Sequence, residues 1–251
     1  EVKDIDFNLK KIVLSNRPSV NYSKLVLNYG SQTIIPKEFE SLVKNRNAFS
    51  IKPFLRAYDS ILKEDIFDSV NELPFVIVGS GLAAIEVSYA LRKRWRDRPL
   101  KLLCDSRKIN NTILKSLRNS NIDLVEKLNF DYGKILLCTG NTSPLWAQKK
   151  LLDSDSYGRI ITNQNLQIKS FSGIFAVGDC AVVGSAKRPA SGVFAVKVVN
   201  TLVQNLKKDI EGRSLKKWFP QKIGLQIVNI FPSHHPKAFA IYRNFVFGPS
   251  F

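Results

Sequence analysis

Methionine, long apolar runs, cysteine and histidine are absent or scarce in this 251-residue sequence. No apolar run reaches the roughly 18 residues that predict a transmembrane helix, because the best candidate, residues 75–91, is interrupted by glycine, serine and Glu86. The first residues lack the basic and apolar regions of a secretory signal. We therefore expect a cytoplasmic globular protein. The missing methionine leads us to expect an internal piece of a longer polypeptide.

The few cysteines and histidines argue against two kinds of site. Cys104, Cys138 and Cys180 are far apart, so the sequence offers neither a CxxC redox pair nor a zinc cluster. This spacing disfavours a thiol–disulfide reductase and fits a reducing compartment. The adjacent His234 and His235 have no further ligands nearby in sequence, so we interpret them as part of a polar turn and predict no metal.

The charge is unbalanced, because 38 Lys and Arg residues outnumber 21 Asp and Glu residues, for a formal net charge of +17. A basic surface attracts nucleic acids, anionic membranes or acidic cofactors. The densest basic stretch, residues 92–98, lies at the end of a predicted helix, where cations favour the helix dipole. We interpret this stretch as a solvated face.

The clearest motif follows a short apolar run. Residues 75–78 predict a buried strand of parallel-sheet type, and the sequence GSGLAA then leads into a predicted helix. This strand–GxGxxG/A–helix context is typical of a dinucleotide site. Gly79 permits the tight turn, Gly81 leaves room for a pyrophosphate, and Ala84 lets helix and strand pack closely. The helix N-terminus offers N–H groups to the phosphates.

Charged residues near this motif suggest further nucleotide contacts. A second predicted strand ends at Asp105, where a carboxylate can bind the 2′-hydroxyl of an NAD ribose. Arg107 and Lys108 are close enough to tolerate a 2′-phosphate, so the choice between NAD and NADP stays open. Glu86 is either a carboxylate favoured by the helix dipole or an acid that faces the nicotinamide.

The remaining pattern predicts an α/β fold. Apolar spacing predicts helix over residues 37–70, and residues 134–138 read as another buried strand. A strand over 173–177 leads into Gly178 and Asp179, and a long helix follows over 192–208. Beyond Gly212 the chain changes character, and residues 228–230 and 238–247 predict the strands of a terminal module.

Three of these stretches together carry a family resemblance. Residues 79–86, 136–140 and 174–181 resemble the ordered motifs of flavoproteins with two Rossmann-like dinucleotide-binding domains, in which an NAD(P)-binding domain is inserted into an FAD-binding domain. The lack of a redox-active cysteine pair makes the chain similar to type II NADH dehydrogenases. Residues 51–54 and 188–196, with 205–206 and 220–221, resemble a narrower branch: the flavoprotein module at the N-terminus of some selenide, water dikinase fusion proteins.

The resemblance implies a set of site residues. Asp179 would hydrogen-bond the flavin ribityl chain, and the backbone at Val193 and Phe194 would place a helix N-terminus near the isoalloxazine. Lys52 near the active face and Glu86 on the nicotinamide side are the implied catalytic residues. The full implied FAD-contacting set is Gly30, Ser31, Thr139, Gly140, Gly178, Asp179, Val193 and Phe194.

The resemblance also implies a domain plan. The expected parts are a first FAD-binding segment over 1–70, an NAD(P)-binding domain over 71–133, a second FAD-binding segment over 134–212 and a partial C-terminal module over 213–251. The first GxGxxG of the family, which holds the FAD pyrophosphate, has no counterpart in the sequence. We therefore expect an incomplete FAD domain.

The leading functional hypothesis is an FAD-dependent NAD(P)H oxidoreductase that passes hydride from the nicotinamide to flavin and then to an unidentified acceptor. A fused or associated selenide, water dikinase domain and a peripheral membrane contact are implied partners, and no nucleic acid is expected. Two alternatives stay open. One is a degenerate nucleotide-binding sensor or scaffold. The other is a basic protein that contacts membranes or nucleic acids through residues 92–98 and 207–217.

Overall fold

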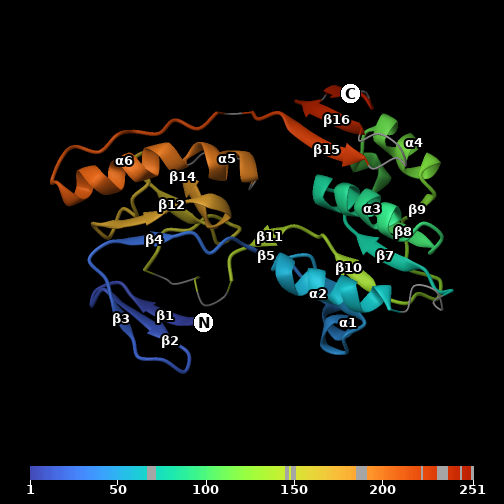
Figure 1. The fold of residues 1–251 in the computed structure, drawn as a ribbon, viewed down its shortest axis with the longest axis horizontal. Helices are drawn as coiled ribbons and strands as arrows, with labels where there is room; N and C mark the ends of the chain where they lie inside the picture. Colours follow the sequence, from blue (N-terminus) through green and yellow to red (C-terminus); the bar gives the residue numbers. More distant parts are fainter. Residues whose placement is uncertain are drawn as a thin grey trace. The chain divides into compact units, whose positions relative to one another are not determined.

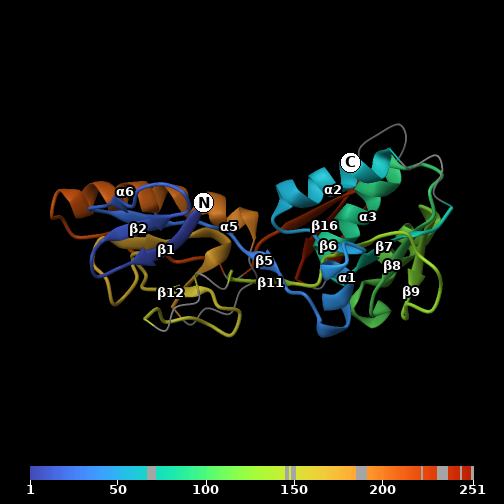
Figure 2. The same ribbon diagram turned by 90° about the horizontal axis from the view of Figure 1, so that it is seen from below.

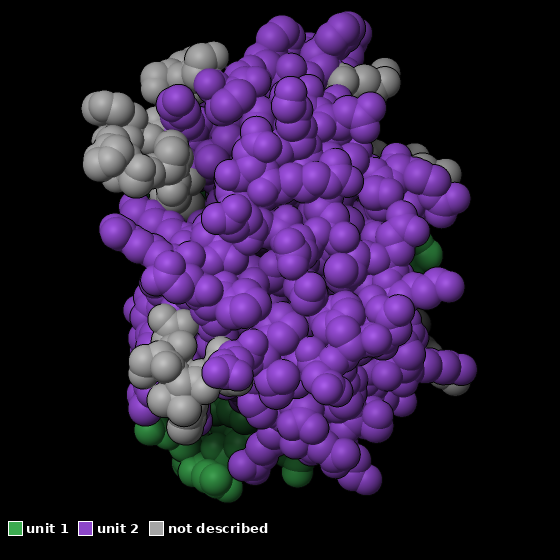
Figure 3. Space-filling view, turned by 90° about the vertical axis from the view of Figure 1, so that its right-hand side faces the viewer, with its two compact units in different colours: residues 1–32, 141–222 green, residues 33–140, 223–251 purple. Residues whose placement is uncertain are grey.

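The chain folds into two compact units, which are coloured separately in Figure 3. The first unit consists of Glu1–Gln32 and Asn141–Lys222, and the second of Thr33–Gly140 and Ile223–Phe251. Two short strands, β5 (Gln32–Thr33) and β11 (Asn141–Thr142), lie where the chain passes from one unit to the other. The computed structural model describes residues 1–66, 72–144, 147, 151–184, 191–221, 223–230, 237–243 and 245–249.

The second unit is built on a five-stranded parallel sheet in the order β6–β10–β7–β8–β9. Its central strand, β7 (Phe75–Val78), is buried along its whole length, as its apolar sequence predicts. Successive residues alternate, so that Ile77 packs into the core on one face and Val76 into the core on the other. The other strands are β6 (Ala48–Ser50), β8 (Leu100–Leu103), β9 (Ile122–Val125) and β10 (Ile135–Leu137).

Helices cover both faces of this sheet (Figure 2). Helix α3 (Leu82–Arg94) connects β7 to β8, α4 (Asn111–Asn119) connects β8 to β9, and both pack on the face that includes Ile77. The short helix α1 (Glu40–Lys44) covers the opposite face. These βαβ connections between parallel strands make the unit Rossmann-like and confirm the predicted α/β class.

The helix predicted over residues 37–70 is interrupted. A 3₁₀ turn, η1 (Lys37–Phe39), and α1 are separated from α2 (Phe54–Asp65) by strand β6. The prediction is therefore wrong for residues 48–50, which pair in parallel with β10, a partner far along the chain. Long-range pairing of this kind overrides the local apolar spacing.

A second, antiparallel sheet in this unit packs against α3 (Figure 1). Its strands β15, β16 and β17 are hydrogen-bonded in sequence order, and Val228 and Phe239 are buried in the same core as α3. The strands predicted at 228–230 and 238–247 are confirmed, with the second divided in two. The bounds are β15 (Gln226–Ile230), β16 (Lys237–Tyr242) and β17 (Phe245–Phe247).

The first unit holds an antiparallel sheet and two parallel strand pairs. The antiparallel strands are β1 (Val2–Asp6), β2 (Lys11–Leu14) and β3 (Val20–Asn21). In the parallel pairs, β4 lies beside β13 and β12 beside β14. Their bounds are β4 (Leu25–Leu27), β12 (Ile160–Thr162), β13 (Ile174–Ala176) and β14 (Ala181–Val183).

The helix predicted over 192–208 is present as α5 (Gly192–Lys197) and α6 (Val199–Ile210). Within α6, Asn205 is fully buried and holds the chain that follows the helix. Its amide nitrogen donates to the carbonyl oxygens of Asn165 and Lys216, both at 2.9 Å, and its amide oxygen accepts from the Lys216 N–H at 2.8 Å. These hydrogen bonds hold the segment at Lys216, which follows α6, against that helix.

Two features are absent from the part of the chain that the structure describes. None of its helices combines the length and apolar character needed to cross a bilayer. Within the same ranges, no three His, Cys, Asp or Glu side chains gather as a metal site. His234 and His235 lie outside the described residues.

The interpretation of the basic stretch 92–98 as a solvated face is wrong for Arg94 and Arg98, which are paired with carboxylates. The Arg98 side chain is fully buried, with its guanidinium 2.9 Å from a carboxylate oxygen of Glu64 and 4.6 Å from the ring of Trp95. Arg94 and the Trp95 indole N–H both bind the carboxylate of Asp65. Because the carboxylates belong to the C-terminal turn of α2, these contacts fasten that helix to the end of α3.

We predict that Glu64→Ala destabilises the protein by about 3–5 kcal/mol, because it leaves the buried Arg98 guanidinium without its counter-ion. The matched control is Asp123→Ala, which removes the exposed partner of Lys101 and is expected to cost about 1 kcal/mol or less. Urea denaturation of both variants checks this. Equal losses of unfolding free energy in the two variants would show that the buried Glu64–Arg98 pair stabilises the fold no more than an exposed ion pair does.

Candidate functional site

The turn after β7 requires glycine at its first position. Gly79 has a φ of +145°, and a Cβ there would lie 2.5 Å from the backbone oxygen of Cys138 and 3.3 Å from the Cβ of Ala84. Ala84 itself is fully buried, so helix and strand pack closely at this point. The backbones at Gly79 and Cys138 can therefore approach this closely only because Gly79 has no side chain.

Gly81 has the opposite environment. It is the residue before α3, and a Cβ built on it would meet no heavy atom within 4 Å. The backbone at Gly81 thus borders open space at the N-terminus of a 13-residue helix, where unpaired N–H groups and the helix dipole favour an anion. The geometry fits a ligand phosphate that approaches the main chain.

The place of this turn in the sheet strengthens that reading. From β7 the chain continues through β8 and β9 on one side, and β10 then returns to the other side of β7. In open α/β sheets, ligands bind outside the carboxyl ends of the strands where the order reverses in this way. Gly79 lies at the carboxyl end of β7 and Cys138 at that of β10, so the turn stands at this switch point.

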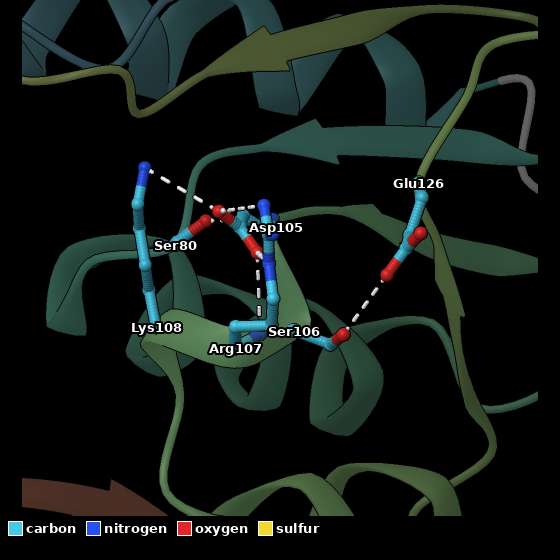
Figure 4. A network of polar contacts seen from close by, with 6 residues as sticks. All are labelled: Ser80, Asp105, Ser106, Arg107, Lys108 and Glu126. Carbon is cyan, nitrogen blue, oxygen red and sulfur yellow. Dashed lines mark hydrogen bonds and ion pairs between the residues drawn. The ribbon is translucent and has the colours of Figure 1, made fainter.

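Asp105 follows β8 and lies within a polar network around the same turn (Figure 4). Its backbone N–H donates to Ser80 Oγ at 2.9 Å, which ties the end of β8 to the glycine turn. Its carboxylate accepts from Arg107 Nε at 2.9 Å, Arg107 Nη2 at 3.1 Å and the Arg107 backbone N–H at 3.2 Å. Lys108 Nζ lies 3.6 Å from Oδ2 of the same carboxylate.

These contacts determine the ionisation of Asp105. The hydrogen bonds from the Arg107 side chain, followed by the bond from its backbone N–H, lower the pKa of the Asp105 carboxyl to about 2. The carboxylate is therefore ionised at every pH near neutrality. As an anion it only accepts hydrogen bonds, which is what a ribose hydroxyl requires of its partner.

Glu86, one of the two predicted catalytic residues, is half-buried on α3. Its carboxylate accepts a long hydrogen bond, 3.4 Å, from the side-chain amide of Asn229 on β15. The sequence offered no signal for Asn229, because the pairing depends on the C-terminal sheet packing over α3. A role for Glu86 at the nicotinamide stays a prediction.

Lys52, Thr139 and Gly140 all lie in the second unit, close to where the chain enters and leaves it. The Lys52 N–H donates to Thr33 Oγ1 at 3.0 Å, and the Thr139 hydroxyl donates to the carbonyl of Ile34. The Ile34 N–H in turn donates to the carbonyl of Gly140 at 3.1 Å, and Gly140 has a φ of +107°. The structure thus joins these residues to the 33–34 segment. Their contact with a flavin stays a prediction.

In the first unit the structure brings together two sequence-predicted turns. Because β4 and β13 are parallel neighbours, the turns that follow them emerge at the same edge. Ser31 Oγ, after β4, donates to Asp179 Oδ2, after β13, at 3.4 Å. A Cβ on Gly178, which has a φ of +76°, would lie 2.4 Å from Asn28 Oδ1. The sequence did not single out Asn28, whose side chain lies against this turn.

A small pocket adjoins this edge. Gly178 and Phe194 both line it, whereas Val193 is not among its lining residues and is 39% exposed. Arg159 and Trp218 also line the pocket and were missed, because neither belongs to a recognisable motif. The Arg159 side chain donates to Asp155 Oδ2 at 2.7 Å. Residues 188–190 of the resemblance lie outside the described residues.

All three cysteines are free, buried thiols. Burial raises the pKa of Cys138 to about 12 and is the largest cause that raises that of Cys180 to about 11; the pKa of Cys104 is also raised, again chiefly by burial. Since the thiolate is the reactive form, these residues are poor nucleophiles near neutral pH. The expectation that the chain is not a thiol–disulfide reductase stays a prediction.

Comparison with known proteins agrees with this geometry. The human Ferroptosis suppressor protein 1 is 24% identical over 87% of this chain, and the chain spans about 65% of the length of that relative. A Dictyostelium discoideum protein named "Probable NADH dehydrogenase" is 25% identical over 73% of the chain and 52% of its own length. Among solved structures, a NAD-dependent persulfide reductase from A. fulgidus superposes with a TM-score of 0.69 at 19% identity, covering 96% of this chain and 48% of that one.

A family model described as pyridine nucleotide-disulphide oxidoreductase matches residues 1–198, which is well over half of the chain. The strand–turn–helix at Gly79, the switch point beside it and the paired turns at Ser31 and Asp179 are consistent with that match. The chain therefore belongs to the pyridine nucleotide-disulphide oxidoreductase family, whose cofactors are FAD and NAD(P)H.

Proposed function

We propose that the protein is an FAD-dependent oxidoreductase that takes hydride from NAD(P)H and passes the electrons to a second acceptor. The observation that carries the proposal is the Gly79–Gly81 turn at the switch point of the five-stranded sheet, where Gly81 borders open space. Membership of the family supports the same activity. FAD, when bound, supplies the chemistry that accepts the hydride.

The second unit supplies the binding of the nicotinamide nucleotide. The N-terminus of α3 holds the pyrophosphate through backbone N–H groups, and Gly81 lets it approach the chain. Asp105 accepts a hydrogen bond from the adenosine ribose. The network through Ser80 keeps these two contacts in a fixed relation. These residues bind and orient the nucleotide and do not take part in the bond changes.

The first unit supplies residues that fit the flavin. Asp179 is held by Ser31 at the edge where a ribityl chain would run, and Gly178 is free of a side chain that would collide with Asn28. The pocket lined by Gly178 and Phe194 lies next to α5. In the second unit, Lys52 is proposed to act near the active face as a cation, and Glu86 on the nicotinamide side as an acid.

A narrower assignment rests on the sequence resemblance. We propose that the chain belongs with the type II NADH dehydrogenase-like members, because its three cysteines are buried and form no redox pair. The sequence resemblance of residues 51–54 and 188–196, with 205–206 and 220–221, supports the flavoprotein module of selenide, water dikinase fusion proteins as the specific branch. The reducing equivalents would then serve selenium chemistry, and a peripheral membrane contact is a further proposal.

We predict that the FAD-loaded protein loses its oxidised-flavin absorbance when it is mixed anaerobically with NADH or NADPH. Stopped-flow absorbance measures this directly, and protein without added FAD is the control. Tight nucleotide binding without bleaching would instead support a sensor or scaffold. Absence of both binding and bleaching would overturn the proposed activity.

We predict that Gly81→Val weakens NADH binding by about tenfold or more, because its side chain enters the space where the pyrophosphate meets the backbone. Folding stability is expected to change little, since a Cβ at Gly81 meets no atom within 4 Å.

The matched variant is Gly79→Ala, which is expected to destabilise the fold because its Cβ lies 2.5 Å from a carbonyl oxygen. Calorimetric binding and thermal melting separate the two effects. Unchanged NADH affinity in a folded Gly81→Val protein would argue against a nucleotide at this turn.

A further inference from the structure

The polar network around Asp105 contains more charge than a ribose hydroxyl needs. Two cations, Arg107 and Lys108, lie on the short 3₁₀ turn η2 (Ser106–Lys108) directly after the aspartate, and both contact its carboxylate. A second carboxylate, Glu126, accepts a hydrogen bond from Ser106 Oγ at 2.9 Å. Figure 4 shows Lys108, Asp105 and Arg107 beside Ser80 of the glycine turn, with Ser106 and Glu126 on the other side of Asp105.

The side chains of Arg107 and Lys108 are largely exposed, and their charged groups contact the Asp105 carboxylate. The Asp105 side chain is 26% exposed, whereas those of Arg107 and Lys108 are 87% and 71% exposed. Ion pairs between solvent-exposed side chains are weak, because water competes for both partners. Neither cation is locked by packing, so either side chain can turn toward another anion at little cost.

The carboxylate, by contrast, is fixed. The hydrogen bond from the Asp105 N–H to Ser80 anchors its backbone, and its oxygen caps η2 through the Arg107 N–H. Two ionised carboxylate oxygens have about four acceptor sites. A ribose hydroxyl can therefore bind Asp105 while Arg107 keeps a contact with it.

We propose that Arg107 and Lys108 form a displaceable counter-ion pair that lets this ribose site accept both NADH and NADPH. The inference rests on the proposed function and defines the nucleotide of that site. With NADH, Asp105 accepts from the 2′-hydroxyl and the two cations stay beside it. With NADPH, Arg107 and Lys108 leave the carboxylate and bind the 2′-phosphate, which matches the fork of an arginine well.

The negative charge of Glu126 limits how strongly the site can bind a 2′-phosphate. It is exposed, and its charge acts on Arg107, contributing to the raised pKa of that guanidinium, although Asp105 is the main cause. A 2′-phosphate therefore meets two cations and two carboxylates. Because the two positive charges offset the two negative charges, we expect comparable affinity for NADH and NADPH. A site with Asp105 alone would repel the 2′-phosphate.

The test uses binding of the adenosine half, so that it is independent of flavin and hydride transfer. Isothermal titration calorimetry of the full chain at low ionic strength compares ADP-ribose with 2′-phospho-ADP-ribose. We predict dissociation constants within about tenfold of each other. Higher salt is expected to weaken the phosphorylated ligand more, because its contacts are exposed ion pairs.

Variants separate the two binding modes. Arg107→Ala is expected to weaken 2′-phospho-ADP-ribose by about tenfold or more and leave ADP-ribose unchanged or tighter. Asp105→Asn is expected to weaken ADP-ribose and strengthen the phosphorylated ligand. Glu126→Gln is expected to strengthen the phosphorylated ligand alone. The control for loss of one positive charge is Lys115→Ala, an exposed residue on α4, which should change neither affinity.

The outcomes distinguish this inference from the proposed function. Binding of ADP-ribose with discrimination of about a hundredfold or more against the phosphorylated ligand would overturn the dual specificity and leave the oxidoreductase proposal standing. An equal loss of both ligands in Arg107→Ala would show that the arginine has no role specific to the 2′-phosphate, and would also overturn the inference. If neither ligand bound the folded wild-type chain, the nucleotide site itself would be wrong.

Discussion

The close approach of two backbones at the carboxyl ends of β7 and β10 is the constraint on which the second unit depends. At Gly79 there is no room for a Cβ, because the carbonyl of Cys138 stands 2.5 Å from where it would be. That approach lets β7 and β10 pair in parallel along their length and lets α3 start immediately after the turn. A helix N-terminus then points at the space outside the sheet, where a phosphate can bind.

The first unit uses the same principle with other residues. Parallel pairing of β4 with β13 brings the turn at Ser31 beside the turn at Asp179, although they are far apart in sequence. A glycine again marks the point of closest contact, since Gly178 faces the side chain of Asn28. In both units, therefore, strand pairing decides which turns meet, and small residues decide how closely they meet.

The large positive charge has a more local meaning than its total suggests. Within the stretch 92–98, Arg98 is buried against Trp95 and Glu64, and Arg94 is paired with Asp65, so these cations build the fold. Arg107 and Lys108 instead remain largely exposed beside one carboxylate. Net charge alone cannot separate these roles, because burial and partners determine what each cation does.

Features that depend on neighbours along the chain could be predicted from the amino-acid sequence. The apolar run at 75–78, the glycine turn and the helix after it are adjacent in sequence, so their order predicts the βαβ unit and its site. Other features became visible only in the folded chain. Strand β6, the Asn229–Glu86 contact and the presence of Asn28 under Gly178 arise from pairing between distant segments. Local patterns carry no information on such contacts, because the free energy that forms them comes from packing that exists only in the folded chain.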